Sequence, residues 1–194
     1  MSRRLTISVI TMAFAAVLAA TVSGASLRLA AAGKTPYVIV VDPAATVAEK
    51  HAATELGVFL KQITGADFPI RDAAVLPDGP AILVGPGPLV ALLAPDVKLN
   101  DLAPDGLVIE SRGEHLILAG DRPRGTLYAV YTFLEQVLGC RWWSSKVSTI
   151  PRKADLTVPE QHVRYVPPLE YREPFWSDAF DADWAVRNKS NGAT

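Results

Sequence analysis

Hydrophobic residues follow two patterns along the chain, short continuous runs and longer stripes at helical spacing. The first run, residues 37–41, is apolar and β-branched, which predicts a strand buried on both faces. A helix then opens near Thr46, and Gly65 predicts its end because glycine favours the left-handed residue that follows a helix. The apolar stripe of this helix consists of Ala52, Leu56, Phe59, Leu60 and Ile63.

The middle of the chain predicts mostly strands. Residues 68–70 indicate a short edge strand, because Pro69 cannot donate to a ladder. Residues 81–84 predict a further strand, and residues 89–93 a single helical turn. The runs at 107–110 and 116–119 are too close for a parallel crossover, so we expect an antiparallel hairpin.

A second helix is expected to open at Asp121-Arg122-Pro123, with Pro123 in the first turn, where proline is tolerated. Gly139 ends it, and further strands are predicted at 141–143 and 156–158. The hairpin excludes a purely parallel sheet. The pattern therefore predicts an α/β domain of the α+β type, with a mixed, largely antiparallel sheet and two main helices packed on one face. The stripe of the second helix consists of Leu127, Val130, Tyr131, Leu134 and Leu138.

Residues 1–25 are typical of an export leader. Arg3 and Arg4 precede an uncharged apolar segment, and small residues precede a cut after Ala25. The segment is also about long enough to span a bilayer, so an uncleaved anchor is the alternative. We expect an exported protein, periplasmic or extracellular, that meets the membrane only through this signal.

Length and composition narrow the remaining classes. The 194 residues are 49% hydrophobic and 20% charged, as in globular proteins. A (β/α)₈ barrel needs about 250 residues, so this sequence cannot contain a complete one. A net charge of -1 gives no electrostatic case for a nucleic-acid partner. The single cysteine, Cys140, indicates a buried thiol. Because prolines accumulate beyond residue 150, we expect a domain over 36–159 and a linker with a new element over 160–194.

One candidate anion site lies between a strand and a helix start. Backbone N–H groups at a helix N-terminus favour anions, and two arginines add forked donors. A phosphate or carboxylate is the conceivable ligand. In the alternative, Asp121 caps the helix, the arginines pair locally, and Gly125 permits close packing. The candidate residues are Arg122, Arg124, Gly125 and Thr126.

Other chemistry-bearing residues give weaker signals. Successive residues of a strand point to opposite faces, so only one of Trp142 and Trp143 can stack on a sugar, and we take Trp143 as the candidate. The three histidines lack metal-ligand spacing, and no metal site is expected. The acidic cluster at 178–183 could supply the paired carboxylates of glycoside hydrolysis, but we favour helix capping or a solvated loop.

Two segments resemble the non-catalytic N-terminal domain of bacterial glycoside hydrolases. They are Arg-Gly-Thr-Leu-Tyr at 124–128 with its continuation to Leu-Gly-Cys-Arg-Trp-Trp at 138–143, and Ala-Ala-Thr-Glu-Leu at 52–56 followed by Thr64-Gly65. The sequence is most similar to the α-glucuronidase N-terminal domain and DUF4838 proteins, and more distantly to the second domain of β-hexosaminidases. The resemblance covers about residues 37–159.

The resemblance implies an α/β domain packed against a catalytic (β/α)₈ barrel that follows it. Residues 168–174 and 184–192 are similar to the first barrel strand and helix, and Arg172 matches an arginine that contacts the sugar in the hexosaminidase relatives. In these families the catalytic carboxylates lie on later barrel strands, so the resemblance implies no catalytic residue and no cofactor in this chain. The remainder of the barrel is missing from these 194 residues.

We therefore expect the exported accessory domain of an α-glucuronidase-like glycoside hydrolase, acting on polysaccharides such as xylan and catalytically inert by itself. Its expected partners are the catalytic barrel and carbohydrate. The alternative is a stand-alone extracellular carbohydrate-binding or adhesion module.

Overall fold

A computed structural model describes residues 26–192, and its centre is one mixed six-stranded sheet. The pairings from β3 through β2 and β4 to β6 are parallel, whereas β5 pairs antiparallel with both β6 and β10. This arrangement confirms the predicted fold class, including the hairpin and the edge position of β3. In spatial order the strands are β10 (His162–Tyr165), β5 (Leu107–Arg112), β6 (His115–Gly120), β4 (Ala81–Val84), β2 (Val38–Val41) and β3 (Ile70–Asp72).

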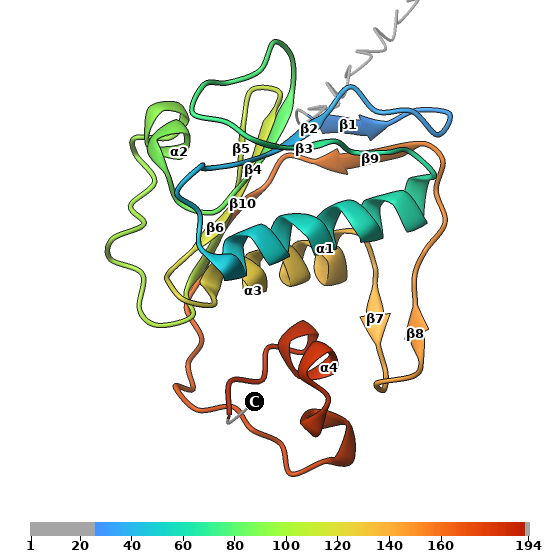
Figure 1. Ribbon diagram of the computed structural model, residues 1–194, viewed down its shortest axis with the longest axis vertical. Helices are drawn as coiled ribbons and strands as arrows, with labels where there is room; N and C mark the ends of the chain where they lie inside the picture. The colour runs from blue at the N-terminus through green and yellow to red at the C-terminus, as the bar shows by residue number, and fades with distance from the viewer. Residues whose placement is uncertain (1–25, 193–194) are drawn as a thin grey trace, which may run out of the picture.

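Two helices cover one face of this sheet, as predicted. They are α1 (Val47–Thr64) and α3 (Gly125–Thr132), which continues into the wider turn η1 (Phe133–Val137), and both pack into the main hydrophobic core. The short helix α2 (Pro88–Leu93) lies over the opposite face with a smaller core of its own (Figure 1). The sheet is therefore covered unequally, by long helices on one face and by one short helix on the other.

α1 starts and ends at the predicted positions, and local capping explains both ends. The Thr46 hydroxyl accepts a hydrogen bond from the Glu49 amide, and the Glu49 carboxylate accepts one from the Thr46 amide. This reciprocal capping satisfies two amides that the helix cannot pair itself. Gly65 closes the helix in the left-handed region with φ 79°.

The start of α3 differs from the prediction. The helix begins at Gly125, so Pro123 lies before it rather than in its first turn, and Arg122-Pro123 is a cis peptide bond. Asp121 does not cap the helix with its side chain; its main-chain oxygen accepts from the Gly125 amide at 2.7 Å. The chain bends here because it must cross the end of β6 at close range.

Smaller elements extend the domain at both ends. β1 (Ser26–Ala30) pairs with β9 (Leu156–Pro159), and the predicted strand at 141–143 is β7 (Arg141–Trp142), paired with β8 (Ser148–Thr149). Sheet pairings thus involve residues before 36 and beyond 159, where we had placed no sheet strand. The expected leader, residues 1–25, lies outside the described residues. Within residues 26–192 no helix is long and apolar enough to cross a membrane.

Candidate functional site

Residues 169–192, which we call the C-terminal segment, lie beside the helices α1 and α3 (Figure 1). The segment contains a 3₁₀ turn, η2 (Ser177–Phe180), and a short helix, α4 (Ala182–Arg187). Polar and aromatic contacts hold this part of the chain on the domain. The contact region between the segment and the domain is the candidate functional site.

Asp105 is the centre of the strongest polar contact. Its carboxylate is 3% exposed and accepts hydrogen bonds from Arg124 Nε at 2.9 Å, Arg172 Nη2 at 2.8 Å and Asn191 Nδ2 at 2.9 Å. Arg124 belongs to the sheet domain, whereas Arg172 and Asn191 belong to the C-terminal segment. One buried carboxylate therefore joins the segment to the domain, and we call these four residues the Asp105 cluster.

Three glycines position the Asp105 cluster. A Cβ atom on Gly120 would lie 2.3 Å from the carbonyl carbon of Gly125, and one on Gly125 would lie 2.3 Å from the Gly106 oxygen. Only glycine permits backbones to approach so closely. The loop that carries Asp105 and the start of α3 that carries Arg124 are thereby held against the end of β6.

The pKa of Asp105 is lowered by these contacts. Burial alone would raise it, but hydrogen bonds from Arg124, Arg172 and Asn191 stabilise the ionised form more strongly. The pKa of Arg124 is raised in turn, mainly by its hydrogen bond to Asp105. The cluster is therefore ionised and paired at neutral pH.

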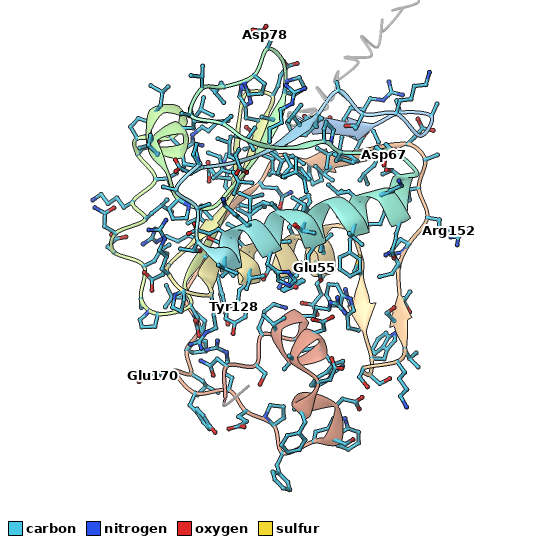
Figure 2. The ribbon with its side chains drawn as sticks, in the orientation of Figure 1. Glu55, Asp67, Asp78, Tyr128, Arg152 and Glu170 are labelled. Carbon is cyan, nitrogen blue, oxygen red and sulfur yellow. The ribbon has the colours of Figure 1, made fainter. Side chains whose placement is uncertain are left out.

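A second contact joins α4 to α1. The Arg187 guanidinium donates to Glu55 Oε2 at 2.9 Å and lies over the Phe59 ring at 5.4 Å from its centroid. The Tyr131 hydroxyl donates to the same Glu55 oxygen at 3.1 Å. Figure 2 shows the labelled Glu55 on the side of α1 that faces the segment. Burial raises the pKa of Tyr131, with the Glu55 charge as the next cause, so its hydroxyl stays protonated and available to donate.

Aromatic residues of the domain also meet the segment. The Tyr128 hydroxyl donates to the Ser190 carbonyl at 3.0 Å, and the Trp184 indole donates to the Trp142 carbonyl at 3.1 Å. The Arg172 guanidinium stands 5.6 Å from the centroid of the Tyr128 ring, within the range of a cation–π contact. Tyr128, labelled in Figure 2, faces the segment from α3.

A hollow of about 270 Å³ remains between the domain and the segment. Tyr128, Tyr165, Trp184 and Arg172 line it. Most polar atoms around it are already engaged, since Arg172 donates to Asp105 and to the carbonyls of Lys189 and Leu169. The arrangement can hold two parts of a protein together, and its described residues include no pair of carboxylates facing each other across a free space.

Both arginines of the predicted anion site are already paired within the chain. Arg122 pairs with Glu49 at 2.9 Å and Arg124 pairs with Asp105, so each guanidinium already contacts a carboxylate. Gly125 permits the close backbone contact with Gly106 and Gly120, and Thr126 is buried with its hydroxyl unpartnered among the described residues. Local pairing, the alternative that the sequence left open, is the arrangement observed.

The two predicted sugar contacts lie apart. Arg172 is part of the Asp105 cluster, whereas Trp143 is 63% exposed on β7–β8 and donates its indole N–H to the Thr149 hydroxyl. The neighbouring Trp142 is buried, as the alternation required. Sugar contact by Arg172 or Trp143 stays a prediction.

The acidic cluster near the C-terminus has structural roles. Asp181 caps α4 by accepting from the Trp184 amide at 2.8 Å, and Asp178 accepts from the Ser145 amide and hydroxyl at 2.7 Å. Asp183 pairs with Arg187 within the same helix. Among residues 26–192 no group of three or more histidine, cysteine or acidic side chains could hold a metal ion.

The outer side of the C-terminal segment is apolar and exposed. Phe175 is 98% exposed and makes an edge-to-face contact with Phe180, whose ring is also exposed. Single apolar side chains are common on protein surfaces, but several in one short segment indicate a surface for a partner. The exposed set is Leu169, Tyr171, Phe175, Trp176 and Phe180.

Sequence reasoning missed Asp105 and Asn191. Asp105 has φ 63°, a conformation that aspartate and asparagine tolerate better than other residues with a side chain. Asp-Gly at 105–106 is a turn signal, but a turn signal does not distinguish an exposed aspartate from a buried one. The partners of Asp105 lie 19, 67 and 86 residues away, so only the fold brings them together.

Comparison with known proteins gives structural likeness only. No protein-family model matches the sequence, and no curated protein does. A solved structure of a family GH115 4-O-methyl-α-glucuronidase, described as specific for decorated arabinogalactans, is similar over 76% of this chain and 19% of its own, with 16% identity and a TM-score of 0.54. This likeness supports the fold.

Two β-hexosaminidase structures are similar over a comparable region. The Streptomyces plicatus enzyme shares 16% identity with a TM-score of 0.48, and the family GH20 enzyme of Streptomyces coelicolor A3(2) shares 17% with 0.49. Each match covers 77% of this chain and 25% of the other. The chain thus spans a quarter or less of the glycoside hydrolases that it resembles in structure.

Proposed function

We propose that this chain is the exported, non-catalytic N-terminal domain of a glycoside hydrolase, related to the α-glucuronidase N-terminal domain and DUF4838 proteins. Its role is to hold the first elements of a catalytic (β/α)₈ barrel and to form part of the interface with that barrel. The 4-O-methyl-α-glucuronidase neighbour supports this assignment through its fold and through the small part of its length that is matched.

The observation that carries the proposal is the two-sided C-terminal segment. Its inner side is fixed to the domain by the buried Asp105 cluster and by the Arg187–Glu55 pair. Its outer side exposes large apolar side chains, Phe175 among them. A segment held firmly on one side and apolar on the other is what an element between two packed domains requires.

The proposed substrate class is a plant polysaccharide with uronic-acid side chains, such as xylan. The glycoside-hydrolase resemblance suggests this class, and the neighbour's described activity on decorated arabinogalactans supports uronic-acid chemistry of the same kind. The sugar-contacting residue proposed in this chain is Arg172, which lines the hollow beside the segment. Trp143 is a second candidate contact because its ring is exposed.

Two measurements test the proposal. The DNA downstream of the codon for Thr194 is sequenced, and the complete product of the reading frame is assayed on aldouronic oligomers beside the 194-residue chain. We expect turnover by the complete product and none by the chain. A stop codon directly after Thr194, with stable expression of the chain, would instead support a stand-alone carbohydrate-binding or adhesion module. Turnover by the chain that is lost in Asp178→Asn would contradict a non-catalytic role.

A further inference from the structure

The sheet face opposite α1 and α3 is only partly covered. The small core under α2 involves β2, β4 and β6, whereas the adjoining strands β5 and β10 border a groove of about 330 Å³. Val97 and Val108 contribute its apolar part, and polar side chains of β5, of β10 and of the loop after α2 line the rest. We call this space the β5–β10 groove.

Ion pairs fix the loop that forms one wall of the groove. Arg112 of β5 donates to Asp96 Oδ2 at 2.5 Å. Arg164 of β10 donates to the Lys98 carbonyl at 2.6 Å and pairs with Asp101. The groove is therefore built between two strands and a loop tied to both of them, so its shape is largely formed without a ligand.

Polar atoms in the groove keep free hydrogen-bonding capacity. The Glu110 side chain is 10% exposed, and its Oε1 accepts from Arg112 and from His162 Nδ1 at 2.8 Å. Glu110 Oε2 has no hydrogen-bond partner within residues 26–192. His162 donates to this oxygen through Nδ1, since a carboxylate only accepts, so Nε2 is the ring nitrogen left to face a ligand. Nε2 lies 3.7 Å from Glu160, beyond hydrogen-bond distance.

The charges that line the groove balance. Three basic side chains stand against three acidic ones, and most of them pair with each other across the groove wall. The exposed Lys98 ammonium forms no ion pair among the described residues and adds a free donor. A balanced set of donors and acceptors beside an apolar floor suits a neutral molecule with several hydroxyl groups. The charged residues are Lys98, Arg112, Arg164, Asp96, Asp101 and Glu110.

We propose that the β5–β10 groove binds one neutral sugar unit of a glycan. Ligand hydroxyls donate to Glu110 Oε2, pair with His162 Nε2 and accept from Lys98, while a C–H face of the ring packs on Val97 and Val108. The volume is at the lower end of small-molecule sites, about 300 to 1,000 Å³, and fits a single unit. The groove and its free polar atoms do not depend on the proposed function. The choice of a sugar over another polyol does rest on the proposed glycoside-hydrolase function.

The test is a titration of the ¹⁵N-labelled chain with galactose, xylose and glucuronate, followed by backbone amide shifts. We expect shifts concentrated on β5 and β10, with galactose or xylose binding in the millimolar range and glucuronate no more tightly. Glu110→Gln should weaken binding about tenfold, the ratio expected when one hydrogen bond to a charged acceptor is lost. Lys98→Ala, an exposed position, should weaken it severalfold without affecting folding.

Lys34→Ala is the matched control, because this exposed lysine lies in the turn after β1, outside the groove lining. It should leave the affinity unchanged. The proposal is overturned if no sugar shifts β5 and β10, if shifts cluster elsewhere, if Lys98→Ala has no effect, or if glucuronate binds most tightly. Any of these results with an active complete product would remove the groove site and leave the proposed function standing.

Discussion

Replacing Asp105 by asparagine should release the C-terminal segment from the domain while the sheet stays folded. The substitution keeps the shape of the side chain and tolerates the left-handed backbone at φ 63°. It removes the negative charge that Arg124 and Arg172 share. The change therefore isolates the electrostatic part of the contact from any backbone strain.

The magnitude follows from burial. Removing one partner of a fully buried ion pair costs about 3 to 5 kcal/mol. The two arginines are 39% and 20% exposed, so water can partly solvate them once the carboxylate is gone. We therefore expect the free energy of opening the segment to fall by about 2 to 4 kcal/mol. At about 1.4 kcal/mol per factor of ten, protected amides there should exchange roughly 30- to 1,000-fold faster.

Hydrogen exchange measured by mass spectrometry checks this expectation, because it separates peptides of residues 169–192 from those of α1 and β6. Asp183→Asn is the control, since its carboxylate is 63% exposed and pairs only within α4. Its effect should stay below about 0.5 kcal/mol. Asn191→Ala, which removes one of the three donors to Asp105, should give a smaller acceleration than Asp105→Asn. Unchanged exchange in Asp105→Asn, or equal acceleration in segment and sheet, would refute the reasoning.

Four further predictions concern acid, the buried thiol, the close glycine contact and the export leader. Because the pKa of Asp105 is lowered on folding, its contribution is present above the unfolded pKa of about 3.9 and is lost as pH falls through the folded value. Protection factors in the segment, which are corrected for the slower intrinsic exchange in acid, should therefore fall at low pH. Burial raises the pKa of Cys140 to about 11, so a thiol reagent at pH 8 should label it only after unfolding. Gly125→Ala should destabilise the whole domain by several kcal/mol, seen as a lower melting temperature, because its Cβ would meet the Gly106 oxygen. Mass spectrometry of the exported protein should find a mature N-terminus between residues 26 and 33, and an intact Met1 in the membrane fraction would contradict cleavage.

Local signals predicted the elements of this fold well where the chemistry is local. Thr46 precedes α1 and Gly65 follows it in the structure, as the sequence predicted, because capping depends on residues within one helical turn. The hairpin of β5 and β6 follows from a connection too short for any other arrangement. Two helices on one face follow from their apolar stripes.

Contacts between residues far apart in the sequence explain where the structure differs from the predicted elements. His162–Tyr165 alternates weakly and follows a proline-rich stretch, so nothing nearby marks it as a strand; the exposed edge of β5 makes it one. The start of α3 moved to Gly125 because the crossing with Gly120 and Gly106 determines where the chain can turn. The local preference for proline in a first helical turn is weaker than the backbone contact between residues far apart in sequence.

Contacts between distant residues also change the interpretation of the two arginines before α3. In the sequence, Arg122 and Arg124 beside a helix start suggest an anion from solution. In the structure the carboxylates come from the chain itself, Glu49 on α1 and Asp105 on the loop before β5. Asp105 then has capacity for two further donors, and both come from the C-terminal segment. The two arginines thus hold a buried carboxylate that binds the next part of the polypeptide, as the proposed accessory role requires.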